Sequence, residues 1–133
     1  MTYFHGRTIQ GDFDAVVERT RAALQKHGFG VLTEIDVQAT LKAKIGQDFR
    51  PYRILGACNP LMAHEALKLE PHVGVMLPCN VVLQQTDAGV EVFAVDPAAS
   101  MGAIDNPDLL HHARAVGEHL NAALADVWAP PAA

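Results

Sequence analysis

The chain has 133 residues, half of them hydrophobic and 19% charged, with a formal net charge of −5 at pH 7. This length and composition are typical of one globular domain and exclude wholesale disorder. The surplus of acidic residues disfavours binding to a nucleic-acid backbone or an anionic membrane, because both attract dense positive charge. We therefore expect a single domain over residues 1–133 whose partners include neither nucleic acid nor membrane.

The first half of the sequence predicts strands that alternate with helices. Asp12 is a suitable N-cap, and apolar residues then recur at three- and four-residue steps until Gly28, which ends a long N-terminal helix. β-favouring residues flank it. In chain order we expect a strand at residues 2–9, the helix at 13–27, a strand at 29–35, a short helix at 37–45 and a strand at 48–57, in which Pro51 favours an edge strand or a bulge.

A second helix is predicted to begin directly after Cys58. Asn59 is a favourable N-cap and Pro60 occupies the first helical position, while Pro71 ends the helix. The free N–H groups and dipole of such a helix start can stabilise the Cys58 thiolate. Its apolar neighbours instead favour a thiol buried in the core, because free cysteine is among the most buried residue types. Both interpretations of Cys58 stay open.

The segment after that helix predicts further strands. An apolar run at 73–77 predicts a buried strand, and Pro78-Cys79 predicts a break or bulge before a strand at 80–85. Residues 86–89, with Asp early and Gly late, are typical of a three-residue hairpin loop with a glycine bulge, and they lead to a strand at 90–95.

The C-terminal part predicts a long helix after a connector of small residues. Asn106-Pro107 repeats the Asn-Pro helix start, and a near-heptad apolar stripe follows to Val127, whereas residues 129–133 are expected to fray. Because the hairpin requires antiparallel pairing, we expect an α+β fold. Its sheet is mostly antiparallel or mixed, with about six strands, and a long N-terminal and a long C-terminal helix pack on it.

Catalytic and metal signatures are mostly missing from the sequence. It contains no Gly-x-Ser-x-Gly elbow, phosphate loop, Rossmann glycine fingerprint or His-Glu-x-x-His zinc helix, and its single serine is Ser100. Cys58, His64, His72 and Cys79 form a conceivable Cys/His set, but their spacing matches no known metal motif, and solvated histidines are the preferred interpretation. We therefore predict no catalytic residue and no metal site, and the cofactor stays unassigned.

Three segments and one dipeptide together resemble family 302 of domains of unknown function. They are GFGVLTEID at 28–36, YRILGACNP at 52–60, LPCNVV at 77–82 and Asp96-Pro97, and the likeness extends from about residue 13 to residue 97. The resemblance implies a compact α+β domain that forms dimers, and it implies no activity, because the family has none established. Cys58, Asn59 and Pro60 match the Cys-Asn-Pro segment of the family, and Pro78 and Cys79 match its later Pro-Cys step.

These observations yield one predicted site and two candidate functions. If the strands that end at Cys58 and begin near Cys79 are neighbours, the two junctions face a common hollow. The predicted ligand-binding residues are Cys58, Asn59, Pro60, Pro78, Cys79 and Asn80. We expect a non-enzymatic small-ligand-binding or assembly module that forms a homodimer. The alternative is a thiol-dependent redox, sulfur-transfer or metal- or haem-binding protein that uses Cys58, Cys79 or both.

The N-terminus, the length of the apolar stretches and the number of cysteines together indicate the cellular compartment. The N-terminus, Met1–Arg7, lacks an apolar signal core and a small-residue cleavage site, and no stretch approaches the roughly 20 apolar residues that span a bilayer. Two cysteines are too few for a disulfide scaffold in a chain of this length. We therefore expect a cytoplasmic protein with reduced thiols.

Overall fold

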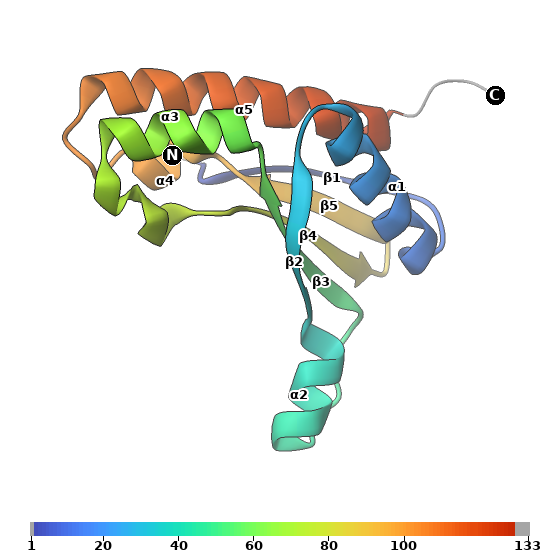
Figure 1. Ribbon diagram of the computed structural model, residues 1–133. Helices are drawn as coiled ribbons and strands as arrows, with labels where there is room; N and C mark the ends of the chain where they lie inside the picture. Colours follow the sequence, from blue (N-terminus) through green and yellow to red (C-terminus); the bar gives the residue numbers. More distant parts are fainter. Residues whose placement is uncertain (1, 130–133) are drawn as a thin grey trace.

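One five-stranded antiparallel sheet, in the order β1-β5-β4-β3-β2, organises the computed structural model, which describes residues 2–129 (Figure 1). The elements in chain order are β1 (Phe4–Ile9), α1 (Phe13–Lys26), β2 (Gly30–Asp36), α2 (Val37–Ile45), β3 (Tyr52–Cys58), α3 (Pro60–Leu69), the 3-10 helix η1 (Pro71–Met76), β4 (Cys79–Thr86), β5 (Gly89–Val95), α4 (Pro97–Met101) and α5 (Pro107–Trp128). The α+β class is thus confirmed. Of residues 129–133, which were expected to fray, all but residue 129 lie outside the described residues.

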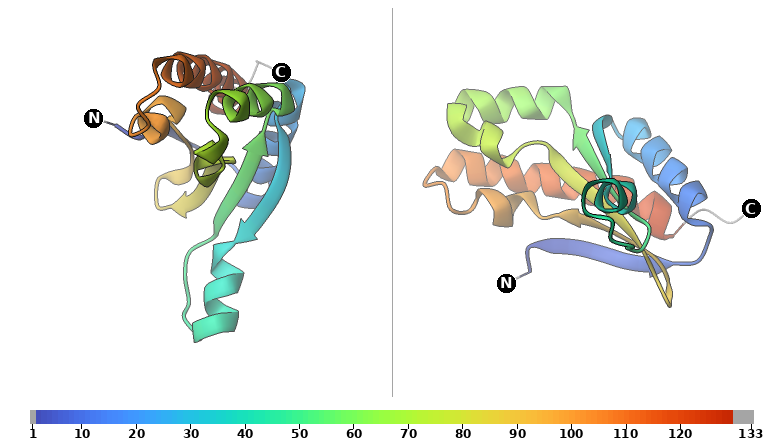
Figure 2. Two further views of the ribbon diagram at one scale, coloured as in Figure 1. Left: turned by 60° about the vertical axis from the view of Figure 1, so that its left-hand side comes forward. Right: turned by 90° about the horizontal axis from the view of Figure 1, so that it is seen from below.

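Helices α1, α3 and α5 lie on one side of the sheet, and the arm made of β2, α2 and β3 projects away from them (Figures 1 and 2). α1 and α5 pack against each other, and the main core lies between them and the sheet. Its largest fully buried side chains include Leu24, Phe29, Leu55, Leu83, Leu120 and Leu124. A smaller apolar cluster, made of Ala66, Val73, Met101, Leu109 and Ala113, joins α3, η1, α4 and α5.

The number of strands differs from the predicted six, because the apolar run at 73–77 is not a strand. Pro71 stands at the start of η1, and the Glu70 side chain caps it by accepting a hydrogen bond from the His72 backbone N–H at 3.3 Å. Val73 is fully buried, whereas Val75 is 83% exposed. Short apolar runs fit a strand and a buried helical turn equally well, and here the proline and the cap decide for the helical turn.

Three further expectations are corrected by the structure. β3 is a central strand between β2 and β4 rather than an edge strand, since Pro51 precedes it and needs no ladder donor there. The N-terminal helix α1 has 14 residues and is much shorter than α5, which has 22. The connector after β5 contains the short helix α4, whose backbone is capped by the Asp96 side chain at 3.0 Å from the Ala98 nitrogen.

The predicted hairpin joins β4 to β5, with a tighter loop than expected. Thr86 pairs with Gly89, so two residues, Asp87 and Ala88, form the turn. Gly89 has a φ of 141°, and a Cβ placed there would lie 2.5 Å from the backbone oxygen of Ile9. Only glycine therefore allows the end of β1 to approach the hairpin so closely.

Replacing Leu120 tests the assignment of the buried face of α5. Leu120 is 1% exposed within the main core, whereas His111 on the same helix is exposed. We expect Leu120→Ala to lower the free energy of unfolding by about 2–4 kcal/mol, because it deletes buried methyl groups and leaves a cavity. His111→Ala, the matched control, should change it by less than about 0.5 kcal/mol. Similar small losses for both variants in urea unfolding would contradict this packing.

Candidate functional site

The end of β3 and the start of β4 lie side by side, which places the two cysteines close together. Ala57 pairs with Cys79 in the β3–β4 ladder, and Cys58 is the last residue of β3. The chain then turns into α3, because the Asn59 side chain accepts a hydrogen bond from the Met62 backbone N–H at 3.2 Å and Pro60 occupies the first turn. One strand pairing thus positions both thiols and the start of α3.

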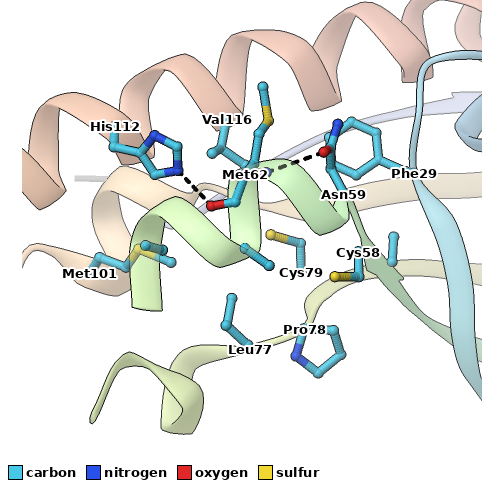
Figure 3. A pocket seen from close by; sticks show the side chains of 13 residues that line it. Phe29, Cys58, Asn59, Met62, Leu77, Pro78, Cys79, Met101, His112 and Val116 are labelled. Carbon is cyan, nitrogen blue, oxygen red and sulfur yellow. Dashed lines mark hydrogen bonds between the residues drawn. The ribbon is translucent and has the colours of Figure 1, made fainter. Parts of the chain in front are cut away.

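A small cavity of about 30 Å³ lies at this junction, where the two apolar clusters meet (Figure 3). Residues from β3, α3, β4, α4, α5, the turn before β2 and the connection between η1 and β4 form its wall. They are Phe29, Ala57, Cys58, Asn59, Met62, Ala63, Ala66, Leu77, Pro78, Cys79, Met101, His112 and Val116. The wall is therefore made almost wholly of carbon and sulfur atoms.

The two polar side chains of the wall other than the thiols are engaged with the backbone of α3. The Asn59 side-chain oxygen caps the helix through Met62, as described above. His112 Nε2 lies 2.8 Å from the carbonyl oxygen of Met62, and because a carbonyl can only accept, Nε2 carries the proton and donates (Figure 3). The His112 bond ties α5 to α3, whereas the Asn59 bond caps α3 itself. Both bonds leave the two thiols as the chemically distinctive groups of the cavity.

The two thiols differ in their surroundings. Cys79 is 7% exposed, and burial raises the pKa of its thiol to about 11, with a smaller contribution from the neighbouring Cys58. The Cys79 thiol is therefore protonated, and a poor nucleophile, at neutral pH. Cys58 is partly exposed and lies directly before the first turn of α3. Of the two, Cys58 is the more accessible to a reagent.

The structure brings together four of the six residues predicted to bind a ligand. Cys58, Asn59, Pro78 and Cys79 all line the cavity. Pro60 is exposed at the start of α3 and does not line it. Asn80 is also exposed and, as the residue after buried Cys79 on β4, has its side chain on the opposite sheet face. Ligand binding by these residues remains a prediction.

Sequence reasoning missed more than half of the cavity wall. Phe29, Met62, Met101, His112 and Val116 come from segments far apart in the chain and reach the cavity through tertiary packing. Val116 lies on the predicted apolar stripe of the C-terminal helix, and such a stripe predicts burial but not the partner across the core.

The histidines proposed with the cysteines as a metal set are not gathered around an ion site. Among residues 2–129, no group of three or more His, Cys, Asp or Glu side chains is placed to hold a metal ion. The side chain of His72 is 92% exposed and lies beside Glu70. His64 is exposed as well, on α3. Their solvated positions agree with the preferred interpretation of these residues.

Together these features define a small α+β protein with one antiparallel sheet, helices on one face and a thiol-lined apolar cavity at the β3–α3 junction. The model of the family described as Domain of unknown function DUF302 matches residues 5–127. The chain belongs to this family.

A solved structure supports the assignment. The chain is similar to the uncharacterized conserved protein DUF302 from Bacillus stearothermophilus, known from a crystal structure. The two share 30% sequence identity with a TM-score of 0.88, over 93% of this chain and 97% of that one. None of the curated proteins compared with the chain matches it. Within residues 2–129, every helix is too short or too polar to cross a membrane.

The raised pKa of Cys79 predicts a specific loss of stability in alkaline solution. Between about pH 9 and pH 11 the unfolded chain has released the Cys79 proton while the folded chain retains it, so the free energy of unfolding falls as the pH rises. From about pH 8 to about pH 10.5 this contribution amounts to about 2 kcal/mol. Urea unfolding of wild type and Cys79→Ala at both pH values measures it by difference.

Cys58→Ala is the matched control for this experiment, since it removes the partly exposed thiol and leaves Cys79 in place. It should retain the alkaline loss seen in the wild type. An identical pH dependence in wild type and Cys79→Ala would contradict the burial of this thiol.

Proposed function

We propose that the protein is a non-enzymatic binding module that takes a small, mainly apolar ligand into the cavity at Cys58 and Cys79. The observation that carries this proposal is the composition of the cavity wall. Carbon and sulfur atoms from five elements line it, and the side chains of Asn59 and His112 are hydrogen-bonded to the backbone of α3. Binding pockets for small molecules are mostly apolar with a few placed polar groups.

The wall does not favour catalysis by general acid and base. Such catalysis needs a titratable group aimed at the substrate with a pKa near the working pH. His112 Nε2–H donates its hydrogen bond to the Met62 carbonyl oxygen. The Cys79 thiol, with a pKa raised to about 11, keeps its proton at neutral pH. These features support binding over turnover.

The size of the cavity limits the ligand. A volume of about 30 Å³ holds one or two water-sized groups. A larger ligand therefore requires that flexible side chains move, and Met62 and Met101 are suited to this because unbranched methionine adapts to irregular spaces. We accordingly expect a ligand of a few heavy atoms, or an apolar end of a longer one.

Xenon is a suitable probe of this proposal, since it enters apolar cavities without polar contacts. We expect a saturable ¹²⁹Xe chemical shift with the wild type that Ala63→Phe abolishes, because the new ring fills space that Ala63 lines. Ala115→Phe, on the exposed side of α5, is the matched control and should keep the shift. With both variants folded by circular dichroism, an unaltered shift in Ala63→Phe would refute binding in this cavity.

A thiol-dependent function is the second candidate, and it is favoured by the presence of Cys58 and Cys79 in the same wall. The redox and sulfur-transfer versions need a reactive thiol, for which Cys58 is the candidate. In the metal version, the thiols with Met62 or Met101 would suit a soft ion such as Cu(I). A cavity of about 30 Å³ is far too small for haem, so the haem version is the least supported.

Thiol titration with a disulfide reagent separates the ligand-binding proposal from the redox and sulfur-transfer versions of the second candidate. These two versions require that one thiol of the native protein react faster than free cysteine, and that Cys58→Ser remove this reaction. The ligand-binding proposal instead requires slow native thiols, with both reacting fully in denaturant. Slow reaction of Cys58 in the native protein would eliminate the redox and sulfur-transfer versions.

A further inference from the structure

Both cysteines of the chain line the cavity at the β3–α3 junction. Cys58 ends β3 and Cys79 begins β4, and Cys58 lies one residue beyond the pair that Ala57 and Cys79 form in the ladder. Neither cysteine is in a disulfide bond. Figure 3 shows the two side chains between α3 and Pro78. The cavity therefore offers two free thiols to the same ligand.

The same cavity gathers most of the sulfur-bearing residues of the chain. The sequence contains two cysteines and four methionines, and both cysteines and two of the methionines, Met62 and Met101, line the cavity. These four residues come from β3, β4, α3 and α4. Thiolates and thioethers are soft ligands, which select soft metal ions. Tertiary packing thus brings together soft donor groups that are well separated in the sequence.

Donors for harder ions are missing from the cavity wall or are engaged elsewhere. No lining residue carries a carboxylate, so calcium and magnesium find no suitable ligands. The Asn59 side-chain oxygen caps α3, and His112 Nε2–H donates to the Met62 carbonyl oxygen. A structural zinc ion takes four nitrogen or sulfur ligands. Among residues 2–129, no third His, Cys, Asp or Glu joins the two thiols in such a set.

We propose that Cys58 and Cys79 together bind one soft monovalent ion, Cu(I) or its analogue Ag(I), inside this cavity. Two thiols suffice for such an ion, because Cu(I) and Ag(I) prefer sulfur ligands and form two-coordinate complexes with thiolates. A volume of about 30 Å³ holds a bare ion but leaves no room for a hydrated one. The inference deepens the metal version of the second candidate function, and it rests on the cavity being open to a ligand.

The start of α3 compensates the charge of the resulting complex. Each thiol releases its proton to solvent as it becomes a ligand, so two thiolates and one monovalent ion carry one net negative charge. Cys58 lies directly before the first turn of α3, a helix of ten residues whose N-terminal dipole favours negative charge. Because Cys58 is partly exposed and Cys79 is buried, the ion enters at Cys58 and Cys79 completes its coordination.

Competition with the Cu(I) chelator bicinchoninate tests the proposal under reducing, oxygen-free conditions. The wild type should take up one Cu(I) per chain, and X-ray absorption at the copper edge should show a first shell of sulfur only. Cys58→Ser and Cys79→Ser should each weaken Cu(I) binding about a hundredfold, because one remaining thiolate cannot form the two-coordinate complex. Met76→Leu is the matched control, since Met76 packs on the smaller apolar cluster outside the cavity wall, and it should leave the affinity unchanged.

Unchanged Cu(I) affinity in either serine variant would overturn the proposal, and so would nitrogen or oxygen ligands in the first shell of the copper. If circular dichroism shows that Cys79→Ser unfolds the chain, Cys79→Ala decides, since it removes the same sulfur without burying a hydroxyl group. Xenon separates this inference from the apolar-ligand proposal. Xenon uptake without Cu(I) binding refutes the soft-ion site alone, whereas Cu(I) binding without xenon uptake supports the soft-ion site and counts against the apolar ligand.

Discussion

The antiparallel pairing of β3 with β4 is the constraint on which the candidate site depends. It sets Ala57 opposite Cys79, and this register brings the end of β3 to the start of β4 although a helix and η1 separate them in the chain. A slip by one residue would turn Cys79 and Val81 from the core to the opposite face, so the burial of Leu55 and Val81 holds the register in place. The hydrophobic core therefore also fixes the geometry of the two thiols.

The placement of the helices on one side of the sheet explains both the cavity and the exposed apolar residues of the opposite sheet face. α1, α3 and α5 bury one face of the sheet, and where the main core meets the smaller cluster their packing leaves the cavity. The opposite face receives no comparable cover within the described residues, and its apolar side chains Ile54, Val82 and Phe93 stay partly exposed. Both features thus follow from the placement of these three helices on one side of the sheet.

Local sequence signals predicted most of the fold, because caps and prolines act over a few residues. Four helices begin at a residue whose side chain accepts a hydrogen bond from a backbone N–H of the first turn. These N-cap residues are Asp12, Asp36, Asn59 and Asn106. The errors arose where local signals are ambiguous, as in the apolar run at 73–77, which tertiary packing resolved into η1.

The candidate site was predictable only in the part that two adjacent junctions supply. Cys58 and Cys79 each lie at a strand end, so their proximity followed once the strands were neighbours. The remaining wall depends on how α4 and α5 cross the sheet, and no pattern within one helix states which residue of another helix it will face. The side chain of Asn80 points away because strand residues alternate between faces, which the predicted break at Pro78-Cys79 obscured.

Pro78 belongs to the cavity wall and also packs against Gly56 of β3. A Cβ on Gly56 would lie 2.8 Å from Pro78 Cγ and would also collide with the Thr33 side chain, so glycine is required for the proline to pack directly over β3. Gly56 lies two residues from Ile54, so both are on the sheet face opposite α1 and α5, and Pro78 also lines the cavity. Because a side chain at position 56 would meet Pro78, any substitution of Gly56 must displace a residue of the cavity wall. The requirement for glycine in the middle of β3 thus follows from the same packing that closes the cavity.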